Sequence, residues 1–186
     1  MIVLLLTTFI VAVFVGVAVG GHVGRLATLR LRWLPFLYLS AVLGLLPLFA
    51  HLSRHASRIS VAAGYLLLAV FLVINARSKK DGIRAGLIVI LIGWLLNTSA
   101  IFANGGMPLS LWAYRASNQA EVPKGGEGGF FKIVIAGPGS RLRMLGDVIP
   151  VRPIRQVVSF GDILLVIGID MIVVFAMRRT ESITPN

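Results

Sequence analysis

Five long apolar runs constrain the fold of this 186-residue chain more than any other feature. A helix needs about 20 apolar residues to cross about 30 Å of hydrocarbon. Lipid offers no hydrogen-bond partners, so the backbone of a crossing segment must bond to itself, as it does in a helix. The runs therefore predict an all-α membrane protein in which five transmembrane helices form a single domain. They cover residues 2–20, 34–52, 59–74, 85–102 and 157–177.

Composition supports this prediction and excludes several classes of function. With 57% hydrophobic and 13% charged residues, the chain does not resemble a soluble domain with one buried core. The formal net charge is +11, but the basic residues flank the apolar runs, so we expect lipid bilayer and no nucleic acid as partner. Cysteine is absent, and no motif predicts a cofactor. His51 and His55 are one helical turn apart, but Arg54 and Arg58 flank them, so we predict no metal site.

The basic residues also predict the orientation of the helices. Two short connections and the tail carry nine of them, whereas the connection between the second and third runs carries only Arg54 and Arg58. Because lysine and arginine favour the cytoplasmic side, we expect the N-terminus outside and the C-terminus in the cytoplasm. The long connecting segment, residues 103–156, then faces outward. The nine residues are Arg25, Arg30, Arg32, Arg77, Lys79, Lys80, Arg84, Arg178 and Arg179.

Small residues recur at helical spacing in the first three runs. In the first run they are four residues apart, at Ala12, Gly16, Gly20 and Gly24. The second and third runs repeat the spacing at Ser40, Gly44, Ser60 and Gly64. Small side chains let two helix backbones approach closely, which matters where lipid is as apolar as the helices. These faces predict packing within the chain, with contact to a partner subunit as the alternative.

The connecting segment has its own local patterns. Pro108 suits the first position of a helix, which predicts a short interfacial helix over about 108–117. Two apolar stretches around a Gly-Pro-Gly-Ser sequence predict a β-hairpin within 130–145. Ser159 and Asp162 have the spacing of a capping box at the start of the last helix.

An ordered set of motifs lies between about residues 97 and 170. It comprises Asn104-Gly105-Gly106-Met107-Pro108, Arg141-Leu142, Leu145-Gly146-Asp147-Val148-Ile149-Pro150 and Phe160-Gly161-Asp162. This set resembles a family of small bacterial integral membrane proteins of unknown function. The resemblance implies a multi-pass protein of the bacterial plasma membrane and supplies no activity.

Five polar residues are candidates for a site at the outer face. They are Asn97, Asn104, Arg141, Asp147 and Asp162. A pair of carboxylates there could do acid–base chemistry or hold a cation. The alternative is structural. A capping role would explain Asp162, and a turn or an ion pair with Arg141, Arg143 or Arg152 would explain Asp147.

Asp170 is the one acid well inside an apolar run. An ionised aspartate at the membrane centre costs about 2.5–3.5 kcal/mol on insertion scales, so a partner is expected. By depth, Tyr38 and Ser40 are candidate hydrogen-bond donors. Bonding between helices or subunits is one interpretation, and proton or ion handling is the other.

These patterns lead to two hypotheses of function. The first is a non-catalytic accessory or scaffold subunit that binds a membrane-protein partner, and it follows from the absence of a catalytic constellation. The second is a membrane enzyme or transporter that binds a lipid-like or small polar ligand at the outer face. The sequence indicates no oligomeric state.

Overall fold

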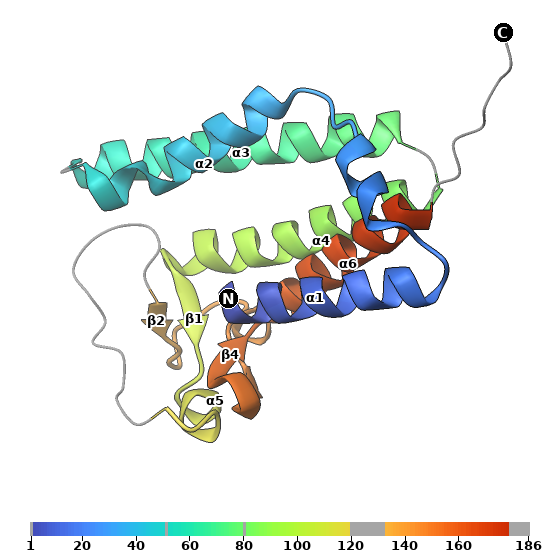
Figure 1. Cartoon of the computed structure of the whole chain (residues 1–186). Helices are drawn as coiled ribbons and strands as arrows, with labels where there is room; N and C mark the ends of the chain where they lie inside the picture. Colours follow the sequence, from blue (N-terminus) through green and yellow to red (C-terminus); the bar gives the residue numbers. More distant parts are fainter. Residues whose placement is uncertain (1, 51, 80, 120–132, 179–186) are drawn as a thin grey trace, which may run out of the picture.

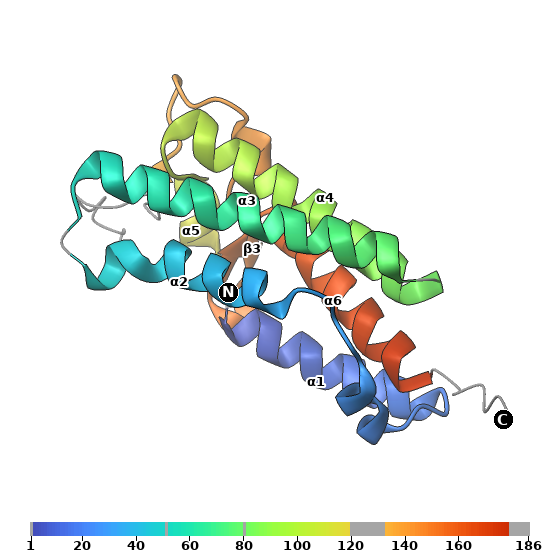
Figure 2. The same cartoon turned by 90° about the horizontal axis from the view of Figure 1, so that it is seen from above.

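The computed structural model describes residues 2–50, 52–79, 81–119 and 133–178. A helix lies within or across each expected run, and the connecting segment adds short elements at one end of the bundle (Figures 1 and 2). α2 and α3 form one antiparallel layer, and α1, α4 and α6 lie together in a second layer (Figure 1). The long helices are α1 (Ile2–Ala18), α2 (Leu34–Phe49), α3 (Arg54–Ser78), α4 (Asp81–Asn104) and α6 (Phe160–Arg178).

Three of these helices are long and apolar enough to cross a membrane: His55–Ser78, Gly82–Asn104 and Phe160–Arg178. α1 and α2 are apolar but shorter, at 17 and 16 residues, so five crossings remain a prediction. α3 was expected to be short and instead has 25 residues. Its helix includes polar residues that a hydropathy pattern leaves out, and the Ser53 hydroxyl caps it by accepting a bond from Ala56 N.

Glycine pairs bring α4 and α6 together, and these two helices make the most extensive contact of the bundle. A Cβ added to Gly93 would lie 2.6 Å from the Gly161 carbonyl oxygen, and the reverse substitution would give the same distance. Gly86 and Gly168 face each other in the same way, with distances of 2.7 and 2.6 Å. No sequence pattern predicted this contact, because its glycines are far apart in the chain.

α2 and α3 approach each other at the small residues that the sequence singled out. A Cβ on Gly64 would lie 2.8 Å from the Ser40 carbonyl oxygen and 3.1 Å from Gly44 N. The Ser60 hydroxyl donates across the same contact to the Leu43 carbonyl, at 2.7 Å. The predicted close packing of these two helices within one chain is confirmed.

The expected small-residue face of the first helix is only partly correct. Ala12 is buried, and Gly16 lies against the Met177 side chain of α6. α1 ends at Ala18, however, and a Cβ at Gly20 or Gly24 would have no atom within 4 Å. Four-residue spacing aligns residues only while the helix continues, so the prediction of one face reaching Gly24 is wrong.

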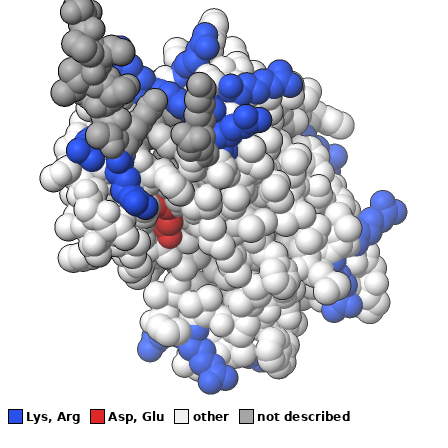
Figure 3. Space-filling view, turned by 90° about the vertical axis from the view of Figure 1, so that its right-hand side faces the viewer, with Lys and Arg blue, Asp and Glu red and all other residues white. Residues whose placement is uncertain are grey.

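The basic connections gather at the bundle end where α1, α3 and α6 finish (Figure 3). The short helix η1 (Val23–Thr28) follows α1, and the Arg25 guanidinium donates to the last-turn Met177 carbonyl of α6. The fully buried Asn75 amide bonds both the N–H and the carbonyl of Arg32, at 2.8 and 3.0 Å. These bonds hold the predicted cytoplasmic connections against the helices.

At the other end, the connecting segment differs from the expected helix and hairpin. Pro108 lies in strand β1 (Met107–Leu109), and α5 (Leu111–Ala116) begins after Ser110, whose hydroxyl accepts a bond from Ala113 N. β1 pairs in parallel with β2 (Ile133–Ile135), which replaces the hairpin predicted within 130–145. Residues 130–132 lie outside the described part of the chain.

An antiparallel pair does form, but it lies later in the chain than predicted. β3 (Ile149–Val151) pairs with β4 (Gln156–Val158), and the turn between them holds the short helix η3 (Arg152–Ile154). Residues 143–145 form another short helix, η2 (Arg143–Leu145), in place of the expected second strand. The local Gly-Pro-Gly-Ser signal specified a turn, whereas strand pairing depended on which extended segment lay beside β1.

Candidate functional site

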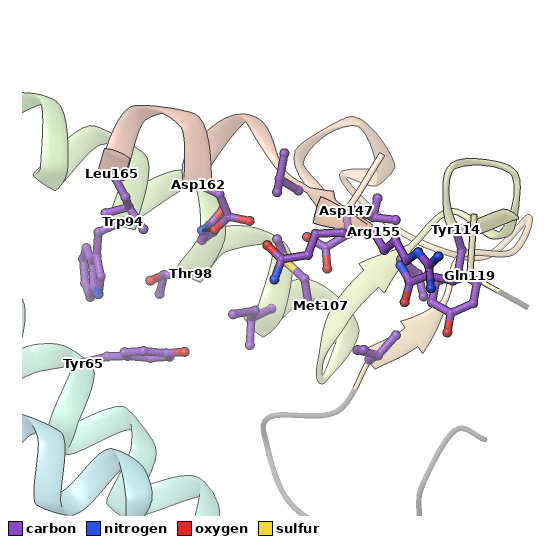
Figure 4. Close-up of a pocket in the computed structure, with 17 residues that line it drawn as sticks. Tyr65, Trp94, Thr98, Met107, Tyr114, Gln119, Asp147, Arg155, Asp162 and Leu165 are labelled. Carbon is purple, nitrogen blue, oxygen red and sulfur yellow. Dashed lines mark hydrogen bonds between the residues drawn. The ribbon is translucent and has the colours of Figure 1, made fainter. Parts of the chain in front are cut away.

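A cavity of about 460 Å³ lies where the connecting segment meets the helices (Figure 4). Helices α3, α4 and α6 contribute its inner part. Strands β1, β2 and β4, the helix α5 and nearby loop residues contribute its outer part. This volume is within the 300–1,000 Å³ typical of small-molecule sites. Of the five predicted site residues, the cavity brings together Asn97, Asp147 and Asp162.

Asp162 is held by a closed set of hydrogen bonds at the start of α6. Its carboxylate accepts from Asn97 Nδ2 at 2.8 Å and from Ser159 N at 3.1 Å. The Ser159 hydroxyl accepts from Asp162 N at 3.0 Å and donates to Asn97 Oδ1 at 2.8 Å. The predicted capping box is confirmed, and Asn97 extends it across to α4. The glycine contact makes this possible, because the Asn97 amide occupies the space a Gly161 side chain would need.

Backbone bonds to β1 fix the position of Asp147. Its N–H donates to the Pro108 carbonyl at 2.7 Å, and its carbonyl accepts from Ser110 N at 2.9 Å. Gly146 allows this approach, since a Cβ there would lie 2.2 Å from the Pro108 carbonyl oxygen. The Asp147 side chain is left to line the cavity.

The Asp147 carboxyl lacks the ion pair that the sequence suggested. Among the described residues it has no salt bridge and no side-chain hydrogen bond. Arg152 donates to the Ala116 carbonyl instead, and Arg141 N bonds Asn104. Burial, followed by the charge of Asp162, raises the pKa of Asp147 from 3.8 to about 7. An acid of this pKa can gain or lose a proton near neutral pH, as a general acid or base does.

Further polar groups of the cavity also lack partners. Within the part of the chain that the structure describes, Trp94 Nε1 and Gln156 Oε1 are buried atoms without a hydrogen bond. Buried polar atoms are nearly always paired, so an unpaired donor and acceptor in one cavity indicate space for a ligand or water. Arg155 also lines the cavity and has a left-handed backbone, with φ at 49°. Sequence reasoning missed Trp94, Arg155 and Gln156, since no local pattern distinguishes them.

The other two predicted site residues bind each other outside the cavity. Asn104 Nδ2 donates to the Arg141 carbonyl at 2.7 Å, and Arg141 N donates to Asn104 Oδ1 at 2.8 Å. Asn104 thus fastens the connecting segment to the end of α4 through backbone contacts. Neither residue lines the cavity that contains Asp147.

The partners suggested for Asp170 do not bind it. The Ser40 hydroxyl donates to the Leu37 carbonyl of its own helix, at 2.7 Å, and Tyr38 is 66% exposed. The buried Asp170 Oδ1 has no partner among the described residues. Equal depth was therefore a poor guide to contact, because the helix faces decide which side chains meet. Within the same described ranges, no three His, Cys, Asp or Glu side chains form a group able to hold a metal ion.

Comparison with known proteins places the chain in a family. The model of a family of unknown function, DUF5317, matches residues 28–174. The chain belongs to DUF5317. The DUF5317 match includes every residue that lines the cavity and leaves out all of α1. No curated protein and no solved structure matched the chain.

Asn97→Ala should test the bonds that hold the inner wall of the cavity. It removes one partner each from Asp162 and Ser159, and both are buried, so we expect a loss of about 1–3 kcal/mol in unfolding free energy. Ser99→Ala is the control, because Ser99 is an exposed residue of the same helix. Thermal unfolding in detergent measures both, and equal transitions for the two variants would contradict the structural role of Asn97.

Proposed function

We propose that this chain is an integral membrane protein with five crossings, whose N-terminus and connecting segment face outward in a bacterial plasma membrane. Large apolar side chains on the open faces of α1 and α2 support this proposal, including Phe14 at 72% and Phe49 at 83% exposure. The basic residues at the opposite end favour the cytoplasmic side. α1 and α2 extend about 25 Å, which a locally thinned bilayer accommodates.

We propose further that the outer cavity binds a small ligand with polar and apolar parts. The observation that carries this proposal is Asp147, a largely buried carboxyl without a side-chain partner among the described residues, in the same cavity as Trp94 and Gln156, which lack partners within the same ranges. Burying such groups is unfavourable unless something pairs with them. A ligand that supplies the missing bonds would explain why they are there. The accessory-subunit hypothesis stays a prediction and requires a partner chain.

Native mass spectrometry of the protein, extracted from its own membrane in mild detergent, tests this function. We expect a discrete small-molecule adduct that Thr98→Phe removes, because Thr98 lines the cavity and a ring would fill it. Leu95→Phe is the matched control, since Leu95 lies on α4 but is 49% exposed. A stoichiometric protein partner without an adduct would instead favour the accessory subunit.

A further inference from the structure

The cavity changes in chemical character along its length (Figure 4). Tyr65, Trp94 and Leu165 form its inner end, within the helices, and Asp147 and Arg155 lie toward the connecting segment. The Tyr65 and Trp94 rings pack edge to face, with centroids 6.0 Å apart. One end thus offers aromatic and aliphatic surface, and the other offers charge.

The apolar end of the cavity is next to a side chain that is exposed on the outside of the bundle. The Tyr65 ring also lies 6.0 Å from that of Phe102, which is 48% exposed. In a membrane the exposed Phe102 ring contacts acyl chains, so the inner end of the cavity lies beside hydrocarbon.

Two acceptor groups of the cavity have no donor partner among the described residues. The Asp147 carboxyl has no partner in the described part of the chain, and neither does the buried Gln156 Oε1. A primary ammonium group carries three donors and a positive charge, which satisfies both acceptors. Arg155, which lies at the same end of the cavity as Asp147 (Figure 4), offers a guanidinium to an anionic group such as a phosphate.

We infer that the cavity binds an amphiphile whose head group carries a primary ammonium and a phosphate, with its hydrocarbon beside Tyr65 and Leu165 and a linkage oxygen, such as an ester oxygen, accepting from Trp94 Nε1. The inference rests on the proposed ligand-binding function and names its ligand class. In this arrangement the ammonium donates to Asp147 and Gln156, and the phosphate accepts from Arg155. A quaternary ammonium has no N–H to donate, so a trimethylated head group binds less well.

The test measures binding of three phospholipids with identical short acyl chains to the purified protein by native mass spectrometry. We expect phosphatidylethanolamine to bind about tenfold or more tighter than phosphatidylcholine or phosphatidylglycerol, because only its amine donates charge-assisted bonds. Asp147→Asn should abolish this preference. Arg155→Gln should weaken the binding of all three lipids, since each has a phosphate. Asp170→Asn, which removes a carboxyl outside the cavity, should change neither result.

The outcomes separate this inference from the proposed function. If the three lipids bind equally and Asp147→Asn has no effect, while Thr98→Phe abolishes binding, the cavity is a ligand site and the amine inference is overturned. If free ethanolamine binds as tightly as the lipid, the inference of an amphiphilic ligand is overturned, and the ligand is a soluble amine. If Thr98→Phe changes the binding of no probe, both the inference and the proposed function fail.

Discussion

Asp147→Asn should stabilise the purified, ligand-free protein at pH 8. The folded structure raises the pKa of Asp147 from 3.8 to about 7, mainly by burial, so the ionised form is less favourable in the folded state. Asparagine has nearly the same shape without the charge. Linkage between the pKa difference and folding gives a gain of up to about 4 kcal/mol in unfolding free energy.

The same difference predicts how stability depends on pH. Below pH 3.8 the carboxyl is protonated in both states and contributes nothing. Between pH 4 and 7 the unfolded chain has lost the proton that the folded protein retains, so stability falls as pH rises. Above about pH 7 both states are ionised and the loss is complete. Thermal unfolding of the wild type from pH 5 to 8 should show this fall, and Asp147→Asn should remove most of it.

Asp162→Asn is the matched comparison, because it makes the same chemical change to the neighbouring carboxyl. Asp162 accepts two hydrogen bonds, so its replacement should destabilise the protein by about 1–2 kcal/mol. If Asp147→Asn raises the unfolding free energy and Asp162→Asn lowers it, then Asp147 is a residue whose charge destabilises the folded protein. If Asp147→Asn is as destabilising as Asp162→Asn, Asp147 has a structural role, and the argument for a ligand loses its main support.

Gly93→Ala and Gly161→Ala should each strongly destabilise the contact between α4 and α6. Either methyl group would lie 2.6 Å from the opposing backbone oxygen, and backbone cannot turn aside as a long side chain can. Overpacking of this kind costs about 1–3 kcal/mol, and the helices must separate to relieve it. At Gly161 the methyl also meets the Asn97 amide, so this variant should weaken the bonds to Asp162 as well.

Gly24→Ala is the control for these two variants. A Cβ at Gly24 has no atom within 4 Å, so its unfolding temperature should match the wild type. Because Gly93 and Gly161 share one contact, the double variant should lose less than the sum of the single losses. Thermal unfolding of the wild type and the four variants in one detergent, with size-exclusion chromatography to check that each is folded, provides the measurement. Equal behaviour of Gly93→Ala and Gly24→Ala would contradict the close helix contact.

Features encoded in consecutive residues could be predicted from the chain alone. The apolar runs predicted the helices because helix formation and hydrophobicity are properties of a local window. The capping box at Ser159 and Asp162 was also predictable, since its two bonds join residues three apart. The expected spacing of small residues succeeded at Gly64, where the helix continued, and failed at Gly24, where it had ended.

The candidate site could be predicted only in part. Asp147, Asp162 and Asn97 stood out because acids and amides are rare near apolar runs, and the cavity contains all three. Asn104 and Arg141 were also included in the predicted outer site, yet they bond to each other outside the cavity. The residue types indicated where polar side chains cluster, but they did not show which of these side chains have hydrogen-bond partners.

The sequence by itself determined the helices, their expected orientation and the cap at the start of α6, because each depends on neighbouring residues. Only the tertiary structure decided the rest. β1 pairs with β2, Gly146 packs on Pro108, and the two glycine-lined helices bring Asn97 to Asp162 across 65 positions. Contacts at such separation depend on how helix faces and strand edges fit together, which no local pattern records. That Asp147 has no side-chain partner among the described residues is visible only once the elements around it are in place.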